Sequence, residues 1–432
     1  MTPPRVNQLH YFALACILLA ALGVRFGVAL HWQHKLAPDV MFEFGDSETY
    51  WQLGETIYRG EPYAYGPREY RVMRTPGYPL LLAGLMRLTG GAASAWDARL
   101  LSVALGGVAV LLTYLAARLM VDARAGLLAA AISALAPCAV ASSVFVLAEA
   151  PFIPVMVGQL GCWWASMTTS SSRRSMLLAN IAGALAAIGV LIRPSWLLFT
   201  PFALGVMLLL RRKESRWWAM QFAPSVVCLL MMAVVLVPWW ARNYLVSGRF
   251  IATTLQAGPS LYDGWRPDAD GASDMRFVGE FETRADRRPE VPSKGIEREI
   301  VLDLEMSKEA KSWAWQNPGR VVQLAGVKFL RTWNVMPNFA EMQSIAMRLA
   351  VMLGYTPVMI TAALGAWKFR ARWDLLLVCL LPAVYFSALH MIYVGSIRYR
   401  QPAMFPLIVL AAAWLASFGR PSSALTMRRA TL

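Results

Sequence analysis

Apolar residues in this chain gather into long stretches that polar connectors separate. A stretch of roughly 17 to 25 apolar residues is long enough to cross a bilayer as a helix. The pattern therefore predicts an all-α polytopic membrane protein with about ten transmembrane helices. The predicted spans are 9–30, 97–118, 125–142, 144–165, 176–192, 195–210, 218–240, 344–366, 374–393 and 401–419. Two of them, 125–142 and 195–210, are short for straight spans.

Two connectors are long and polar, and both fall on the same side of the predicted membrane. In residues 31–96, an amphipathic helical stretch from Ser47 to Tyr58 ends at Gly60, and a short apolar helix follows Pro76. Residues 241–342 begin as a loop rich in Gly, Asp and Pro. They continue with a helical pattern over 296–316 and an interfacial helix beyond it. Because the other connectors are short, we expect the functional residues on this side.

The same pattern predicts three parts. Residues 1–242 form an N-terminal transmembrane module that includes the first outer loop, 31–96. Residues 243–342 form an outer segment with interfacial helices, and residues 343–432 form the C-terminal transmembrane helices and a cytoplasmic tail. The first apolar stretch is not followed by an A-x-A cleavage site, so we expect it to stay as a membrane span.

Composition and charge exclude a soluble enzyme and a nucleic-acid partner. The chain is 57% hydrophobic and 16% charged, against about 25% charged residues in soluble domains. Its net charge of +15 is a matter of topology, because the short connectors on one side carry fifteen basic and three acidic residues. By the positive-inside rule that side is cytoplasmic. The two long segments hold 21 of the 26 acidic residues, so we expect an inner (plasma) membrane protein with both termini in the cytoplasm.

Cysteines and histidines give no sign of a metal site or of disulfides. The five cysteines are scattered through apolar runs, and the four histidines lack the spacing of metal ligands. We therefore predict no protein-encoded metal site, and a divalent cation stays open only as an additional cofactor.

Asp46 lies just outside the first predicted span, two residues before Glu48. Two carboxylates this close can separate in pKa, which leaves one of them ionised as a base. Asp46 is also a good N-cap for the helix that follows, with Glu48 in its first turn. The two roles are compatible, and both stay open.

Several arginines are predicted at the same outer level of the membrane. Arg74 precedes a helix start, a place that suits a phosphate, although anchoring to lipid headgroups is an alternative. Arg193 comes at the outer end of one span, and Arg398 and Arg400 come just before the last one. Ion pairing or snorkelling could explain each of them singly. Together they predict a site for a lipid phosphate.

Glu149 is the one carboxylate well inside an apolar run. Such a group is expensive in lipid and must face a cavity or a partner, so it is a candidate functional residue. The alternative is a structural ion pair with Arg25 or Arg193.

Motifs around several of these residues resemble those of a known family. The sequences DSETYWQL (46–53) and RTPGYP (74–79), with Gly60 between them, resemble the first outer loop of the GT-C glycosyltransferases. The nearest branch is glycosyltransferase family 39, which includes protein O-mannosyltransferases and lipid A aminoarabinose transferases. The sequences EAPF (149–152), RP (193–194), PWWARNY (238–244) and RYRQP (398–402) are similar to the family's later landmarks and come in the same order. The resemblance spans residues 10 to about 418.

The resemblance implies the GT-C fold and an inverting transfer of one sugar from a polyprenyl-phosphate carrier to a lipid, glycan or protein hydroxyl on the outer face. By position, Asp46 matches the catalytic carboxylate, Arg74 a basic residue that contacts the carrier phosphate, and Glu149 a second acidic position. The full set of candidate site residues comprises catalytic Asp46, Glu48 and Glu149; phosphate-binding Arg74, Arg193, Arg398 and Arg400; and substrate-pocket Tyr50, Tyr78 and Arg242. Eukaryotic protein mannosyltransferases carry adjacent Asp and Glu, whereas Ser47 intervenes here, so the acceptor class stays open.

The chemistry of such a transfer agrees with these residues. Displacement at an anomeric carbon needs a carboxylate for the acceptor proton and cations for the departing phosphate. No Gly-rich nucleotide loop is visible, as expected for a lipid-phosphate donor. One alternative is a transporter or flippase for a lipid-linked or anionic solute, which should place its ionisable residues near the bilayer midplane. Another is a non-catalytic membrane partner whose outer loop recruits a protein.

Overall fold

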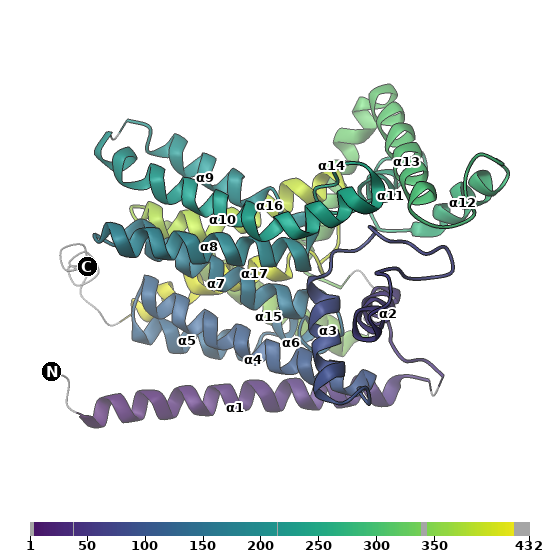
Figure 1. The fold of residues 1–432 in the computed structure, drawn as a ribbon. Helices are drawn as coiled ribbons and strands as arrows, with labels where there is room; N and C mark the ends of the chain where they lie inside the picture. The colour runs from purple at the N-terminus through teal and green to yellow at the C-terminus, as the bar shows by residue number, and fades with distance from the viewer. Residues whose placement is uncertain (1–3, 38, 214, 338–343, 419–432) are drawn as a thin grey trace.

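The protein is a bundle of helices, as the computed structural model shows for residues 4–37, 39–213, 215–337 and 344–418 (Figure 1). Six helices are long and apolar enough to cross a membrane. They are α1 (Pro4–Lys35), α4 (Ala95–Met120), α8 (Ser172–Ile192), α10 (Ser215–Ser247), α15 (Ile345–Lys368) and α16 (Trp373–Ile392). α7 (Glu149–Thr168) has a similar length, and α3 (Gly77–Leu88), α5 (Ala123–Leu135), α9 (Phe199–Leu210) and α17 (Gln401–Ala416) are shorter apolar helices. The prediction of an all-α protein with many apolar helices is confirmed.

The centre of the bundle is α17. Every residue from 401 to 413 is buried, and a helix that is apolar on all faces can exist only where other helices surround it. It packs on α15, α5, α16 and α7. α10 continues to Ser247, past the part boundary predicted at residue 242.

Three predicted spans are divided in the structure or begin several residues later than predicted. The span predicted at 125–142 is divided into α5 and the short α6 (Pro137–Ala141), because Pro137 has no N–H with which to continue a helix. Arg25 fills the break, since its guanidinium donates to the carbonyls of Ser133 and Ala134, both at 2.9 Å. α7 begins at Glu149 and not at 144. The region predicted at 195–210 is the 3-10 turn η1 (Pro194–Trp196) followed by α9.

The first outer loop has the two predicted helices. α2 (Gly45–Arg59) ends at Gly60, which adopts the left-handed conformation (φ 70°) typical of a glycine C-cap. The prediction of Asp46 as N-cap is wrong. Phe44 takes the N-cap position and Asp46 lies in the first turn, so its carboxylate is not used to cap the helix.

The outer segment is more helical than its sequence suggests. α13 (Ile296–Gln316) and α14 (Pro318–Thr332) follow the prediction, but the predicted loop contains α11 (Ala257–Gly264), η2 (Met275–Phe277) and α12 (Val278–Asp286). The rings of Tyr262, Phe277 and Phe281 pack together with centroids 4.9 to 6.3 Å apart. This small aromatic core stabilises helices that the local sequence, rich in Gly and Asp, does not predict.

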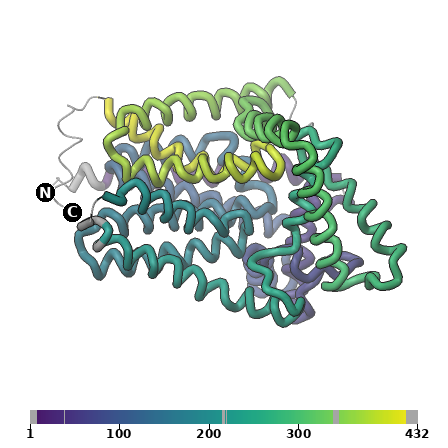
Figure 2. Tube along the Cα trace, turned by 90° about the horizontal axis from the view of Figure 1, so that it is seen from above, coloured from purple at the N-terminus to yellow at the C-terminus, as the bar shows by residue number. Residues whose placement is uncertain are grey.

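The outer segment and the first outer loop meet at one end of the bundle. α2, α3 and α11 to α13 lie together there, whereas the start of α1 and the end of α17 lie at the opposite end (Figures 1 and 2). The long polar connectors are therefore on one side, as the hydropathy pattern predicts.

Candidate active site

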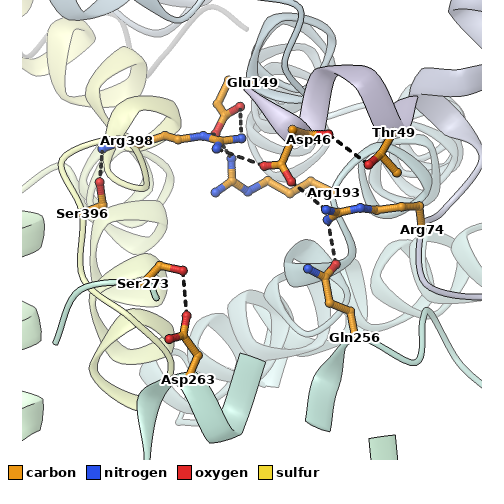
Figure 3. Close-up of polar contacts among 11 residues, drawn as sticks. Asp46, Thr49, Arg74, Glu149, Arg193, Gln256, Asp263, Ser273, Ser396 and Arg398 are labelled. Carbon is orange, nitrogen blue, oxygen red and sulfur yellow. Dashed lines mark hydrogen bonds and ion pairs between the residues drawn. The ribbon is translucent and has the colours of Figure 1, made fainter. Parts of the chain in front are cut away.

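Five charged side chains form one cluster at the end of the bundle where the outer loops meet (Figure 3). We call Asp46, Arg74, Glu149, Arg193 and Arg398 the charged cluster. Arg74 Nη2 lies 2.6 Å from Asp46 Oδ1, and Arg398 Nη1 lies 3.1 Å from Asp46 Oδ2. Arg398 also contacts Glu149 through Nε at 2.6 Å and Nη2 at 3.2 Å. Arg193 Nη1 completes the series 3.0 Å from Glu149 Oε1.

Each member of the cluster comes from the end of a helix or from the connector beside it. Asp46 is in the first turn of α2, Glu149 is the first residue of α7, and Arg193 directly follows α8. Arg74 precedes α3, and Arg398 lies in the turn before α17. Five segments that are distant in sequence therefore bring three guanidinium groups and two carboxylates to one level, with a formal charge of +1.

Gly77 permits the close approach that places Arg74 near Arg193. A Cβ atom at position 77 would lie 2.6 Å from the backbone carbonyl of Leu191, at the end of α8. α3 can therefore start against α8 only because residue 77 has no side chain.

Replacing Gly77 with Ala should consequently lower stability by about 1 to 3 kcal/mol, the usual cost of forcing a methyl group into a packed site. Gly84→Ala is the matched control on the same helix, because a Cβ atom there meets nothing within 4 Å. Thermal unfolding of the purified variants measures both. Equal melting temperatures for the two variants would contradict this account of α3.

The two carboxylates of the cluster differ in access. The Asp46 side chain is 32% exposed, whereas that of Glu149 is 3% exposed. Burial raises the pKa of Asp46, but the charges and hydrogen bonds of Arg74 and Arg398 outweigh burial and lower the pKa to about 2. Asp46 is therefore a carboxylate at neutral pH, and a molecule that binds from outside can reach it.

Arg74 has partners that fix its direction. Its Nη1 donates to Gln256 Oε1 at 2.7 Å, and its guanidinium lies 5.6 Å from the centre of the Tyr50 ring. Tyr78 packs behind Tyr50, with ring centres 5.2 Å apart, and is fully buried. Of the predicted pocket tyrosines, Tyr50 thus borders the cluster and Tyr78 lies in the layer behind it.

Three of the predicted charged site residues lie outside the cluster. Glu48 is exposed and accepts from Gln52 at 3.2 Å. It points away from the cluster because two positions along a helix from Asp46 correspond to a rotation of about 200°. Arg400 points away from Arg398 and donates to the carbonyls of Thr332 and Asn334. Arg242 also binds backbone carbonyls, those of Arg71 and Tyr63. None of these contacts is with a member of the charged cluster, and the roles predicted for the three residues stay predictions.

Sequence reasoning missed Gln256, which reaches Arg74 from the outer segment. No local pattern marks it, because its role depends on how the two outer loops pack. It also missed the ring support of Arg193, whose guanidinium lies 5.7 Å from the Tyr399 ring, itself stacked on His390 at 4.1 Å.

The cluster does not suit a divalent cation. Among the residues that the structure describes, no group of three or more His, Cys, Asp or Glu side chains is close enough to hold one. Asp46 and Glu149 both face arginines.

Comparison with known proteins identifies the class. Residues 73–241 match the family model described as dolichyl-phosphate-mannose-protein mannosyltransferase. The oligosaccharyltransferase AglB of Archaeoglobus fulgidus, solved with an inhibitory peptide and a dolichol-phosphate, is 16% identical. It covers 96% of this chain and 51% of its own, with a TM-score of 0.61. Its apo form gives a TM-score of 0.58 at 16% identity, covering 93% and 50%.

ArnT of Cupriavidus metallidurans bound to undecaprenyl phosphate is also 16% identical, covering 93% of this chain and 77% of its own with a TM-score of 0.43. The chain spans about half the length of AglB. No curated protein sequence matches it. The protein is thus a multi-pass membrane protein with the GT-C fold. Its resemblance to glycosyltransferase family 39 is confirmed, on a match that covers residues 73–241.

Proposed function

We propose that this protein transfers a single sugar from a polyprenyl-phosphate carrier to a hydroxyl of a lipid, glycan or protein. The observation that carries the proposal is the position of Asp46, a partly exposed carboxylate held between Arg74 and Arg398. The family match, and the dolichol-phosphate bound in the archaeal relative, support a lipid phosphate as the donor.

The charge of the cluster suits such a donor. A polyprenyl-phosphate sugar is a phosphodiester with one negative charge, and the cluster carries a formal +1. Arg74 and Arg398 are 17% and 24% exposed, so both can reach a phosphate. Glu149 and Arg193 are more deeply buried, and we assign them to holding Arg398 in place.

The proposed reaction is a single displacement. Asp46 accepts the proton of the acceptor hydroxyl. At the same time the oxygen of that hydroxyl forms a bond to the anomeric carbon of the sugar. The bond between that carbon and the phosphate oxygen breaks, and the phosphate leaves with the electron pair. Arg74 and Arg398 stabilise the charge that develops on it. Attack from the opposite face inverts the configuration.

Donor binding should also activate the base. With its two arginines paired, Asp46 is a weak base, because its pKa is about 2. A phosphate that takes over Arg74 and Arg398 weakens their hold on Asp46, so its basicity rises. We therefore expect the donor to bind before the acceptor is deprotonated.

We propose that the cluster faces the outer side of the plasma membrane and that both termini are cytoplasmic. The long acidic outer segments lie at the cluster end, and the connectors rich in Lys and Arg lie at the other. Ten membrane spans, with α5 and α6 counted as one, agree with this arrangement.

Mass spectrometry of surface lipids, glycans and proteins from wild-type and deletion cells tests the function. A fixed sugar mass that is missing in the deletion, and restored by the wild-type gene, supports it and names both substrates. Unchanged products, together with flux of a lipid-linked or anionic solute into vesicles, would instead favour a transporter or flippase.

Arg74→Ala should raise the donor KM about 10- to 100-fold, because a hydrogen bond to a charged group contributes about 1.5 to 3 kcal/mol. The acceptor KM should stay within about twofold. Arg71→Ala is the matched control, since among the described residues its guanidinium pairs only with Glu69, whose side chain is 37% exposed. Steady-state kinetics with both substrates varied give the two constants. A donor KM equal to that of the wild type would remove Arg74 from the phosphate site.

A further inference from the structure

A fully buried carboxylate in the outer segment holds the backbone of the first outer loop. Glu299 on α13 is 0% exposed. Its Oε2 accepts the N–H of Arg71 at 2.8 Å, and its Oε1 accepts the N–H of Val72 at 3.0 Å. Among the described residues, no lysine or arginine forms an ion pair with it. The hydrogen-bond partners of this carboxylate are therefore two backbone N–H groups.

Arg242 on α10 holds the same peptide segment from the other side. Its Nη1 donates to the carbonyl of Arg71 at 2.8 Å, and its Nη2 donates to the carbonyl of Tyr63 at 3.2 Å. The guanidinium lies over the rings of Tyr63 and Trp239, 5.3 and 5.0 Å from their centres. The N–H and the C=O of Arg71 are thus bound by opposite charges. We call Glu299 and Arg242 the Arg71 clamp.

The clamp also fixes the segment that carries the partner of Arg74. The Val72 carbonyl accepts the N–H of Leu255 at 3.1 Å, and both residues are buried against Ile300 of α13. Gln256 follows Leu255 and contacts Arg74 directly. One set of backbone contacts therefore sets the positions of Arg74 and of Gln256 together.

We infer that Glu299 and Arg242 are positioning residues for Arg74, so that the outer segment completes the donor-phosphate site from a distance. Arg74 follows the clamped residue by three positions, and its own carbonyl accepts from the Tyr63 hydroxyl at 3.2 Å. A guanidinium on a loosely held loop would lose the alignment that phosphate binding needs. This inference rests on the proposed function of Arg74.

The clamp should respond to pH near neutrality. Burial raises the pKa of Glu299 to about 7, against the opposing effects of the two backbone N–H groups and of Arg242. The other charged or titratable groups that influence it are Asp303 on its own helix and Tyr65 on the first outer loop. Below pH 7, one oxygen of Glu299 becomes a hydroxyl and no longer accepts well, so the clamp loosens.

The effect on folding stability has the opposite sign. Because the folded-state pKa lies above the ordinary value of 4.5, the folded protein takes up a proton as pH falls through 7, which favours folding. Acidification should therefore weaken donor binding without unfolding the protein through this group.

Equilibrium binding of undecaprenyl phosphate to the full-length protein in nanodiscs, between pH 6 and 8.5, tests the clamp. Glu299→Gln leaves one acceptor oxygen and adds an amide that repels a backbone N–H. We expect it to bind at least tenfold more weakly at pH 8. The exposed Glu297→Gln on the same helix should follow the wild type. The phosphate of the probe itself titrates near pH 6. The pH dependence of binding to Glu299→Gln therefore gives the contribution of the probe alone. An additional loss of affinity below pH 7 should occur only in the wild type and in the Glu297→Gln control.

Arg242→Lys tests the clamp from its other side, because one ammonium group cannot reproduce the two hydrogen bonds of the guanidinium to the carbonyls of Arg71 and Tyr63. This variant replaces Glu299→Gln in the binding experiment if Glu299→Gln does not fold. Hydrogen–deuterium exchange at Arg71 and Val72 should be faster in both variants. Faster exchange with unchanged binding would make the clamp purely structural and overturn the inference. Wild-type protein that does not bind the probe would instead overturn the proposed function, while the exchange data still report on the clamp.

Discussion

Asp46→Asn is expected to lower kcat for sugar transfer by about 10³-fold, within the range that general-base catalysis contributes. Asparagine has the same shape and keeps an oxygen that can accept from Arg74, now 2.6 Å from Asp46 Oδ1. It cannot take a proton from the acceptor. The variant should also bind the carrier phosphate at least as tightly as the wild type, because the carboxylate that competes for Arg74 and Arg398 is gone.

This pair of results separates a base from a structural residue. A residue needed only for folding would lose binding and catalysis together when it is replaced. The control is Glu48→Gln, two residues further along α2. The Glu48 side chain is exposed and, among the described residues, has a hydrogen bond only with Gln52, so this variant should retain turnover within about twofold. Transfer and binding are both measured on purified protein in nanodiscs. Turnover by Asp46→Asn close to that of the wild type would exclude Asp46 as the base.

The parts of the fold that could be predicted are those that local sequence determines. The 296–316 pattern predicts α13 to the residue, and Gly60 ends α2 because it can adopt the left-handed conformation. The errors arise where tertiary contacts decide. The break at Pro137 is stable because Arg25 binds the freed carbonyls, and α12 depends on the rings of Tyr262 and Phe277. No window of neighbouring residues contains those contacts.

The candidate site divides in the same way. Four charged residues beside predicted spans, and Glu149 inside an apolar run, indicated the five members of the charged cluster, and the structure brings those five together. The pattern could not show direction, so Glu48 and Arg400 face elsewhere although each is two residues from a cluster member. Glu299 had a visible signal. It lies three residues after Ile296 and directly before Ile300, so a carboxylate falls on the apolar face of its helix.

Glu149→Ala is expected to have the largest effect on the folded protein, a loss of about 3 to 5 kcal/mol of stability, which is typical when one partner of a buried ion pair is removed. The Glu149 side chain is 3% exposed and accepts from Arg193 and from Arg398. Without it, Arg193 loses its carboxylate partner and Arg398 keeps only Asp46, in a region from which water is largely excluded. Arg398 should then also lose its alignment with Asp46, so transfer should fall by at least 10²-fold.

A second substitution shows whether the cost is electrostatic. Arg193 lies between the rings of Phe152, Phe386 and Tyr399, each 5.7 to 5.9 Å from its guanidinium, so methionine suits that environment. Glu149→Ala with Arg193→Met should recover part of the lost stability, because one uncompensated charge is removed, yet it should not recover transfer, because Arg398 stays misplaced. The control is Asp374→Asn. Asp374 on α16 pairs with Arg372 and accepts from Trp164, near the end of α7 that is away from Glu149. This variant should leave transfer unchanged. Thermal unfolding and transfer assays of the same preparations give both quantities. If the double variant is no more stable than Glu149→Ala, the loss reflects packing, and Glu149 does not act by balancing the arginines that hold the donor phosphate.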